Sequence, residues 1–343
     1  MLKRLCLGIS LLSLASLSNA APRGVWVKQF GTKESDYTQS VTVDAKGNIY
    51  VVGGTNGTLP GQKSAGYTDA FIRKYDPNGK EVWTRQFGTD GTDYAYSVAL
   101  DTNGNIYVAG YADKTLPSQN SRSEGNVFLR KYNANGREVW TRQFAGSNFY
   151  NMNSVALDPK GNIYVAGSTY DTLPGQESPG AHDAFIRKYD PNGKELWTRQ
   201  FGSTDSDGAN SVATDSKGNV YVSGVADGVL PDQESMGSAD AFVKKYDPNG
   251  KELWTRQFGT RDVDSAVSVA ADAQGNIYVA GHVRGHRALP GQKSFGKLDA
   301  FIRKYDANGN ELWTDQFGAG NPTSAYAVVL DTKGNVYSGF HNY

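Results

Sequence analysis

Residues 83–110 read WTRQFGTDGTDYAYSVALDTNGNIYVAG, and this pattern returns along the whole chain. Its tryptophan recurs at intervals of 57, 57, 57, 57 and 59 residues, and its Gly-Asn-Ile/Val-Tyr tetrapeptide keeps the same step. A repeat this regular predicts one supersecondary unit that is copied many times. The six tryptophans are Trp26, Trp83, Trp140, Trp197, Trp254 and Trp313.

Each copy is predicted to form four short β-strands. In the copy that follows Trp83 we expect them at residues 97–101, 105–110, 126–132 and 138–144. Turns rich in Asp, Asn and Gly separate the first strand from the second and the third from the fourth, which is typical of hairpins. Four strands in a repeat of this length indicate one blade of a β-propeller.

The repeats predict an all-β chain folded as a single β-propeller of four-stranded antiparallel blades over residues 21–343. The sequence supplies six hairpins of the first kind, five of the second and one lone fourth strand at Trp26, so 23 strands in all. The simplest closure is six blades, with the N-terminal strand completing the last. A three-stranded last blade, a truncated last copy and an open array that closes by dimerisation are the alternatives, and we expect a monomer.

The first 20 residues are predicted to be a secretory signal peptide that is cleaved after Ala20. Lys3 and Arg4 precede an apolar run, and small residues at Ser18 and Ala20 fit the cleavage site. We therefore expect the mature protein in the periplasm, at the cell surface or outside the cell. No later stretch approaches the 18 apolar residues that would predict a transmembrane helix.

Composition excludes several classes of protein. With 35 basic and 35 acidic residues, the chain lacks the basic excess of a nucleic-acid binder. Its one cysteine excludes a disulfide framework and any site that needs several cysteines. Loss of the signal peptide would remove that cysteine and, with Lys3 and Arg4, leave 35 − 2 = 33 basic residues against 35 acidic ones.

The stretch from residue 87 to residue 110 resembles the bacterial SBBP repeat, a β-propeller repeat, and the resemblance covers about residues 25–340. It implies a propeller, usually in exported or surface proteins, and it implies no reaction. The family name refers to seven blades, whereas this chain supplies at most six. A second stretch, DPNGKELW at residues 190–197, resembles tryptophan-docking repeats of propellers with and without a quinone, so it implies structure rather than a cofactor.

The tryptophans are interpreted as structural residues, each packed against the neighbouring blade. Binding is expected instead on the face that carries the long second-to-third-strand loops and the fourth-to-first-strand loops, because function tends to reside on the loops of a rigid scaffold. The candidates there are the inter-blade positions, the glutamines of the Leu-Pro-Gly-Gln loops and two histidines of the one loop with an insertion: Asp36, Asp93, Tyr150, Asp207, Asp264, Gln62, Gln119, Gln176, Gln233, Gln292, His282 and His286.

Motifs for catalysis are missing from the sequence. It contains no Gly-x-Ser-x-Gly, no His-Glu-x-x-His and no phosphate-binding loop. The Asp-rich turns supply only one or two carboxylates each, fewer than a calcium loop needs. We therefore predict no catalytic residue, no metal and no cofactor.

The sequence favours an exported binding or structural module that presents its long-loop face to a protein or a glycan. The alternative is a propeller enzyme, a lyase or a hydrolase, with its site at the channel mouth on that face. A quinone- or calcium-dependent oxidoreductase is the third candidate function. The sequence does not identify the partner.

Overall fold

Among the described residues, β-strands joined by turns and loops are the only regular secondary structure. The computed structural model describes residues 26–117, 119, 126–145, 149–318, 320–331 and 333–342. In this part there are 22 strands, and no helix there is long and apolar enough to cross a membrane. The strands fall into two compact units, an N-terminal unit with described residues 26–157 and a C-terminal unit from residue 158 onward.

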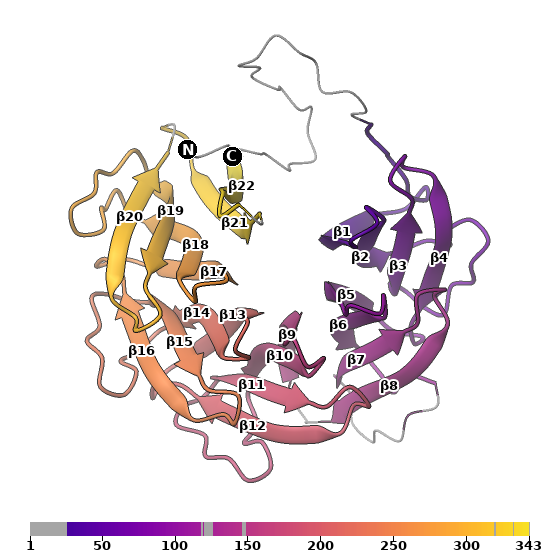
Figure 1. Ribbon diagram of the computed structural model, residues 1–343, viewed down its shortest axis with the longest axis horizontal. Helices are drawn as coiled ribbons and strands as arrows, with labels where there is room; N and C mark the ends of the chain where they lie inside the picture. Colours follow the sequence, from indigo (N-terminus) through magenta and orange to yellow (C-terminus); the bar gives the residue numbers. More distant parts are fainter. Residues whose placement is uncertain are drawn as a thin grey trace. The chain divides into compact units, whose positions relative to one another are not determined.

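The N-terminal unit holds two four-stranded antiparallel sheets and one further strand. Each sheet follows chain order, so every neighbour is reached through a hairpin or a loop. The first strands β1, β5 and β9 pack side by side (Figure 1). The strands are β1 (Asp36–Val43), β2 (Ile49–Thr55), β3 (Asp69–Tyr75), β4 (Glu81–Phe87), β5 (Asp93–Leu100), β6 (Ile106–Ala112), β7 (Asn126–Tyr132), β8 (Glu138–Ala145) and β9 (Phe149–Leu157).

The C-terminal unit repeats this arrangement and ends in a two-stranded sheet, β21–β22. Its first strands β13, β17 and β21 again pack side by side. The strands are β10 (Ile163–Thr169), β11 (Asp183–Tyr189), β12 (Glu195–Phe201), β13 (Asp207–Thr214), β14 (Val220–Ala226), β15 (Asp240–Tyr246), β16 (Glu252–Phe258), β17 (Asp264–Ala271), β18 (Ile277–Arg284), β19 (Leu298–Tyr305), β20 (Glu311–Phe317), β21 (Thr323–Leu330) and β22 (Val336–Asn342).

Two details differ from the sequence prediction. The first strand of each sheet starts about four residues earlier, at Asp93 rather than Ser97 in the second sheet, and a bulge between Ala95 and Ser97 allows the extra length. The lone fourth strand expected at Trp26 is not a strand, because residues 26–35 form no ladder among the described residues. The described part therefore holds 22 strands instead of 23.

The tight turns are held by an aspartate at their first position. In the turn after β5, Asp101 Oδ1 accepts the backbone N–H groups of Asn103 and Asn105, at 2.9 and 2.8 Å. Its Oδ2 accepts the Asn105 amide at 2.7 Å and the Tyr107 hydroxyl at 3.2 Å. Gly104 has a φ of +77°, a conformation that suits glycine. One carboxylate thus fixes the turn and ties it to a buried tyrosine of the next strand.

Neighbouring sheets within a unit are joined by aromatic side chains. Phe87 of β4 meets Phe128 of β7 edge to face, with ring centroids 5.4 Å apart, and Phe201–Phe242 and Phe258–Phe301 repeat this contact. Trp83 lies on the turn glycine Gly136 of the next sheet, where an added Cβ would come within 2.8 Å of the indole. At the junctions within each unit, the tryptophan thus packs against the turn of the next sheet.

Buried carboxylates join the sheets at their loop ends. The N–H of Asp93 donates to Thr68 O of the preceding sheet at 2.7 Å, and Asp93 Oδ2 accepts the Thr89 N–H at 2.7 Å. A Cβ on Gly88 would lie 2.5 Å from an oxygen of both Asp69 and Asp93, so the two carboxylates flank this glycine. Asp183 with Asp207, and Asp240 with Asp264, repeat the arrangement in the C-terminal unit.

These carboxylates hold their protons unusually strongly. Burial raises the pKa of Asp93 from 3.8 to about 6; hydrogen bonds from Thr89 oppose this shift and the Asp69 charge adds to it. Burial likewise raises the pKa of Asp207 and of Asp264 to about 6. The ionised form of each group is therefore destabilised inside its junction.

The first prediction concerns the glycine under a junction tryptophan. Gly136→Ala adds a Cβ against the Trp83 ring and also requires alanine at a φ of +72°. We expect it to lower the free energy of unfolding by about 2–5 kcal/mol, from backbone strain and overpacking. Gly61→Ala is the control, because its φ is +73° but nothing lies within 4 Å of the new Cβ. It should cost about 1–2 kcal/mol in the same urea titration; equal losses would show that Trp83 does not press on Gly136.

The second prediction concerns pH. Because the folded pKa of Asp93, Asp207 and Asp264 exceeds the unfolded value, the folded state binds more protons between about pH 4 and 6. Their stabilising effect is complete below pH 4 and is lost as the pH rises through 6. A shift of about two units corresponds to about 3 kcal/mol for each group. Urea unfolding between pH 4.5 and 7.5 should therefore show stability that falls with rising pH.

Asp93→Asn should remove one of the three aspartate contributions and so flatten the fall, since asparagine keeps an acceptor for Thr89 and does not ionise. His282, whose pKa burial lowers to about 4, opposes the fall in both proteins. Asp76→Asn is the matched control, because Asp76 holds a surface turn in which Asn133 does the same in the next repeat. An unchanged pH slope in Asp93→Asn would contradict the assignment.

Candidate functional site

The two sets of loops lie together, as the sequence analysis expected. Tyr67 N and Thr68 N of the long loop both donate to Gly91 O of the following inter-sheet loop, at 3.0 and 3.2 Å. In the C-terminal unit, Ala239 and Val263 form the corresponding bridge. We call the surface formed by both sets the long-loop face. It comprises residues 56–68 and 88–92 of the N-terminal unit and residues 170–182, 202–206, 227–239, 259–263 and 285–297 of the C-terminal unit.

Most of the aspartates proposed for this face are buried beneath it. Asp93 and Asp264 are 0% exposed and Asp207 is 2% exposed, so they serve the junctions described above. Asp36 is half-buried and accepts the Thr32 N–H at 2.6 Å. Tyr150 lies in β9, and its side chain is outside the described residues. Asp93, Asp207 and Asp264 are therefore not available to a ligand on this face.

The glutamines of the Leu-Pro-Gly-Gln loops also bind their own sheet. Gln62 Oε1 accepts the N–H of Gln86 on β4 at 3.1 Å, and Gln86 Oε1 accepts the N–H of Leu59 at 2.9 Å. The pairs that Gln176, Gln233 and Gln292 form with the fourth strand repeat the first bond at 3.0–3.1 Å. Gln119 is half-buried, and its N–H donates to Leu116 O. These side chains fix the shape of the loops and are only half-exposed.

The two histidines occupy different settings. His282 lies on β18, with Nδ1 3.0 Å from Ser324 Oγ of β21, and burial lowers its pKa to about 4, with Arg284 adding to the effect. Ser324 is 2% exposed, so the pair closes a junction and does not present a nucleophile. His286 is exposed in the loop with a φ of +57°. Among the described residues, no three His, Cys, Asp or Glu side chains are placed to hold a metal ion.

Sequence reasoning missed a set of positions that differ from one junction to the next. His282 and Ser324 are one pair; the corresponding contacts are Tyr94 on Gly54, and Ser168 beside Gly208. The residue types at these contacts differ between copies, whereas the sequences of the surrounding strands are nearly the same in each copy. These positions could have been found by aligning the copies and looking for strand-end positions at which the residue type changes.

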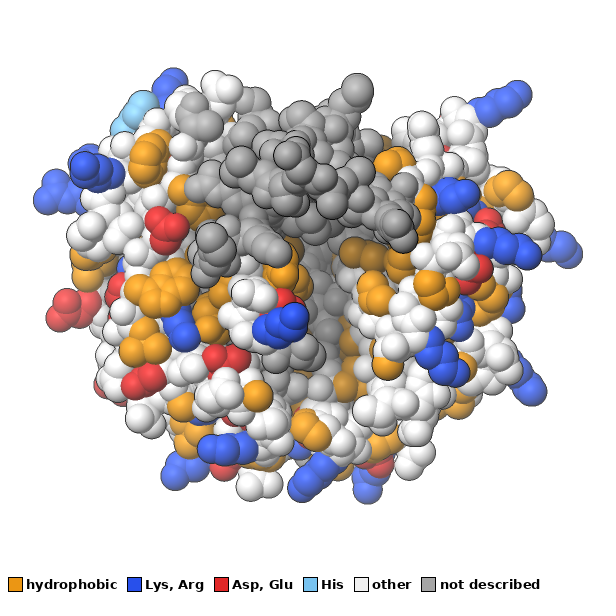
Figure 2. Space-filling view, turned by 45° about the horizontal axis from the view of Figure 1, so that its top comes forward, with side chains coloured by type: hydrophobic (Ala, Val, Ile, Leu, Met, Phe, Trp, Pro, Cys, Tyr) orange, Lys and Arg blue, Asp and Glu red, His pale blue; other side chains and the backbone are white. Residues whose placement is uncertain are grey.

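Exposed apolar side chains stand at the tips of the long loops. Met236 and Phe295 are 50% and 47% exposed, and Tyr67 is 78% exposed. Figure 2 shows hydrophobic side chains mixed with Lys and Arg on the face in view. The tips offer contact surface, whereas the repeated residues below them are used internally.

The chain is similar to two proteins in sequence and to one solved structure in fold. The chain is 27% identical to the regulatory protein FlaEY of Caulobacter vibrioides over 89% of its length and 37% of the relative's. It is 25% identical to the uncharacterized WD repeat-containing protein L264 of Acanthamoeba polyphaga mimivirus, over 76% of this chain and 25% of that one. It thus spans well under half the length of these relatives, 25% of one and 37% of the other. The WD40 domain of Neurospora crassa Pan2 superposes with a TM-score of 0.51 at 11% identity, covering 90% of this chain and 80% of that one, and shows a shared fold.

The family model of the SBBP beta-propeller repeat matches the chain five times. The matches fall at residues 25–60, 82–116, 139–173, 196–231 and 253–282, which together make up half of the chain. Each match starts at or near the tryptophan of one copy and runs through the inter-sheet loop into the first two strands of the next sheet. The protein therefore belongs to the SBBP beta-propeller repeat family.

Proposed function

We propose that the protein is an exported propeller module that binds a protein or a glycan through the tips of its long loops. Export is supported by the signal-peptide pattern of residues 1–20, which lie outside the described residues. N-terminal sequencing of the exported protein should then read from Ala21. The propeller fold and the WD-repeat relatives support an interaction module.

One observation carries this proposal: the loops hold different side chains on the same hydrogen-bonded frame. The N–H of Met236 donates to Asp240 at 2.9 Å, and the N–H of Phe295 donates to Asp299 at 2.8 Å. Ala65 occupies the same place, with its N–H 2.9 Å from Asp69. A buried carboxylate of the third strand thus fixes each tip before any partner arrives.

A fixed tip reduces the entropy that is lost on binding. Ser235 and Ser294 add a second constraint, since each hydroxyl donates to the carbonyl of Gly237 or Gly296, at 3.1 and 3.2 Å. Preorganised loops with varied side chains suit recognition, because less freedom is lost on association. Exposed apolar residues at such positions are typical anchors of binding surfaces.

The third prediction tests the tips directly. Met236→Ser combined with Phe295→Ser should weaken binding of a captured partner or arrayed glycan at least tenfold, because two exposed apolar anchors are lost. Leu253→Ser with Leu312→Ser is the control, since these leucines are 47% and 52% exposed on fourth strands, away from the loops. Binding should be measured by surface plasmon resonance with the mature protein. Equal loss in both double variants, or loss in neither, would contradict the assignment to the loop tips.

We further propose that six blades close into one ring and that residues 26–31 complete the last blade. Support comes from the N-terminal segment, which contacts the first sheet as a fourth strand contacts the next sheet elsewhere. Trp26 lies on Gly79 as Trp83 lies on Gly136, and Phe30 meets Phe71 edge to face at 5.6 Å. The β21–β22 sheet holds two strands where the other sheets hold more.

The fourth prediction tests this closure. No third strand follows β22 among the described residues, so closure by residues 26–31 requires this segment to pair with β22 directly. In the mature chain, the β22 amides that do not face β21 should then be protected from hydrogen exchange, and light scattering should give a monomer. Deletion of residues 21–31 should remove that protection, because the pairing strand is gone. Fast exchange of these amides in the intact chain would contradict closure by this segment, and a dimer would favour the array that closes between two chains.

A further inference from the structure

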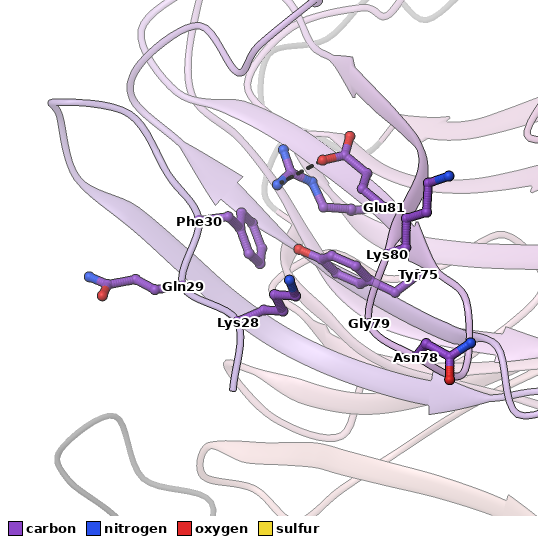
Figure 3. Close-up of a pocket in the computed structure, with 9 residues that line it drawn as sticks. Lys28, Gln29, Phe30, Tyr75, Asn78, Gly79, Lys80 and Glu81 are labelled. Carbon is purple, nitrogen blue, oxygen red and sulfur yellow. Dashed lines mark ion pairs between the residues drawn. The ribbon is translucent and has the colours of Figure 1, made fainter. Parts of the chain in front are cut away.

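The junction between the N-terminal segment and the first sheet contains a cavity. Its volume is about 340 Å³. The side chains of Lys28 and Phe30 point toward the β3–β4 hairpin, whereas Gln29 points away from it (Figure 3). The cavity lies at the tight-turn end of the sheet, so it is separate from the long loops. The lining residues used below are Lys28, Phe30, Arg73, Tyr75, Gly79 and Lys80.

One residue of the repeat is different beside this cavity. At the next junction Arg85 Nε donates to Gly136 O at 2.8 Å, and Arg85 lies over the Trp83 ring at 5.3 Å. The bonds from Arg199 to Gly250 and from Arg256 to Gly309 are the same, both at 2.8 Å. The N-terminal segment has Lys28 at this position, and its side chain is exposed. The guanidinium that lies against the turn glycine elsewhere is therefore replaced by an ammonium, and space remains beside Gly79.

Arg73 lines this cavity, and two of its side-chain nitrogens are buried without a hydrogen-bond partner. It is 4% exposed, its Nη1 lies 3.5 Å from Glu81 Oε2, and its guanidinium lies 4.2 Å from the centroid of Phe30. Among the described residues, its Nε and Nη2 have no hydrogen-bond partner. In other copies the same Nε is satisfied: Arg130 donates to Thr141 at 2.7 Å. A buried donor without a partner is costly, so an acceptor from outside would relieve the cost.

The charges around the cavity also favour a ligand that accepts hydrogen bonds, and one that is negatively charged. Lys28 and Lys80 are exposed at the rim, and the one carboxylate of the lining, Glu81, is already paired with Arg73. We propose that this cavity binds a small oxyanion, a phosphate or a carboxylate group, between Arg73, Lys28 and Lys80. The planar guanidinium offers two parallel donors to two oxygens, and the ammonium groups supply charge. The site is independent of the proposed function of the long-loop face.

The test is a titration of the isotope-labelled mature chain with inorganic phosphate and, separately, with acetate at constant ionic strength. We expect saturable NMR shifts at the amides of Gly79 and Lys80. Saturation by both ions indicates a site for any small oxyanion, and saturation by one alone identifies the preferred group. Absence of saturable shifts with either ion would overturn the proposal.

Three variants separate charge from shape. Lys28→Glu should weaken binding about tenfold, because a charged donor becomes a repelling group. Lys28→Arg keeps the charge but should fill the cavity as Arg85 does at the next junction, so binding should also be lost. Lys194→Glu, at the position of Lys80 in another copy, is the control and should leave the affinity unchanged. Equal affinity in all three variants would show that the anion binds elsewhere.

Discussion

Within each unit, the sheets are held together by one recurring contact: the aromatic fourth strand of a sheet packs onto the turn and third strand of the next sheet. A four-stranded sheet of this size cannot bury its faces alone, and stacking supplies the missing partner. Phe87 against Phe128, with Trp83 over Gly136, is the pattern. Since the junction uses the same residues each time, a glycine under the indole is required wherever a tryptophan precedes it.

The contacts within and between sheets limit which residues can vary between copies. The loop-end carboxylates and glutamines are bound to their own sheets, so a change there disturbs the frame. The exposed side chains of the long loops differ between copies, as Met236, Phe295 and Ala65 show. Met236 and Phe295 stand on one backbone geometry, and this makes the long-loop face suitable for recognition. Arginine at the tryptophan strand belongs to the frame, and a cavity lies beside Lys28, which replaces it in the N-terminal segment.

Much of the fold could be predicted from the sequence because every copy carries its own turn signals. Asp, Asn and Gly at fixed spacing determine the hairpins locally, and the structure has them at the expected places. The candidate site was predicted less well. Asp93 was expected to face a ligand, but it begins a strand and is buried, because a bulge lets β5 extend into what read as a loop. Sequence spacing does not reveal whether a carboxylate points outward or into a junction.

The period, the four-stranded unit and the turns can be derived from the amino-acid sequence, because they depend on signals that recur in every copy. The use of the polar residues is visible only in the folded chain. Asp69 and Asp93, which flank Gly88, and Gln62 and Gln86, which share a hydrogen bond, lie 24 positions apart in the sequence. Burial and the direction of each side chain, which determine whether a polar group binds the frame or a partner, arise only when the sheets are stacked.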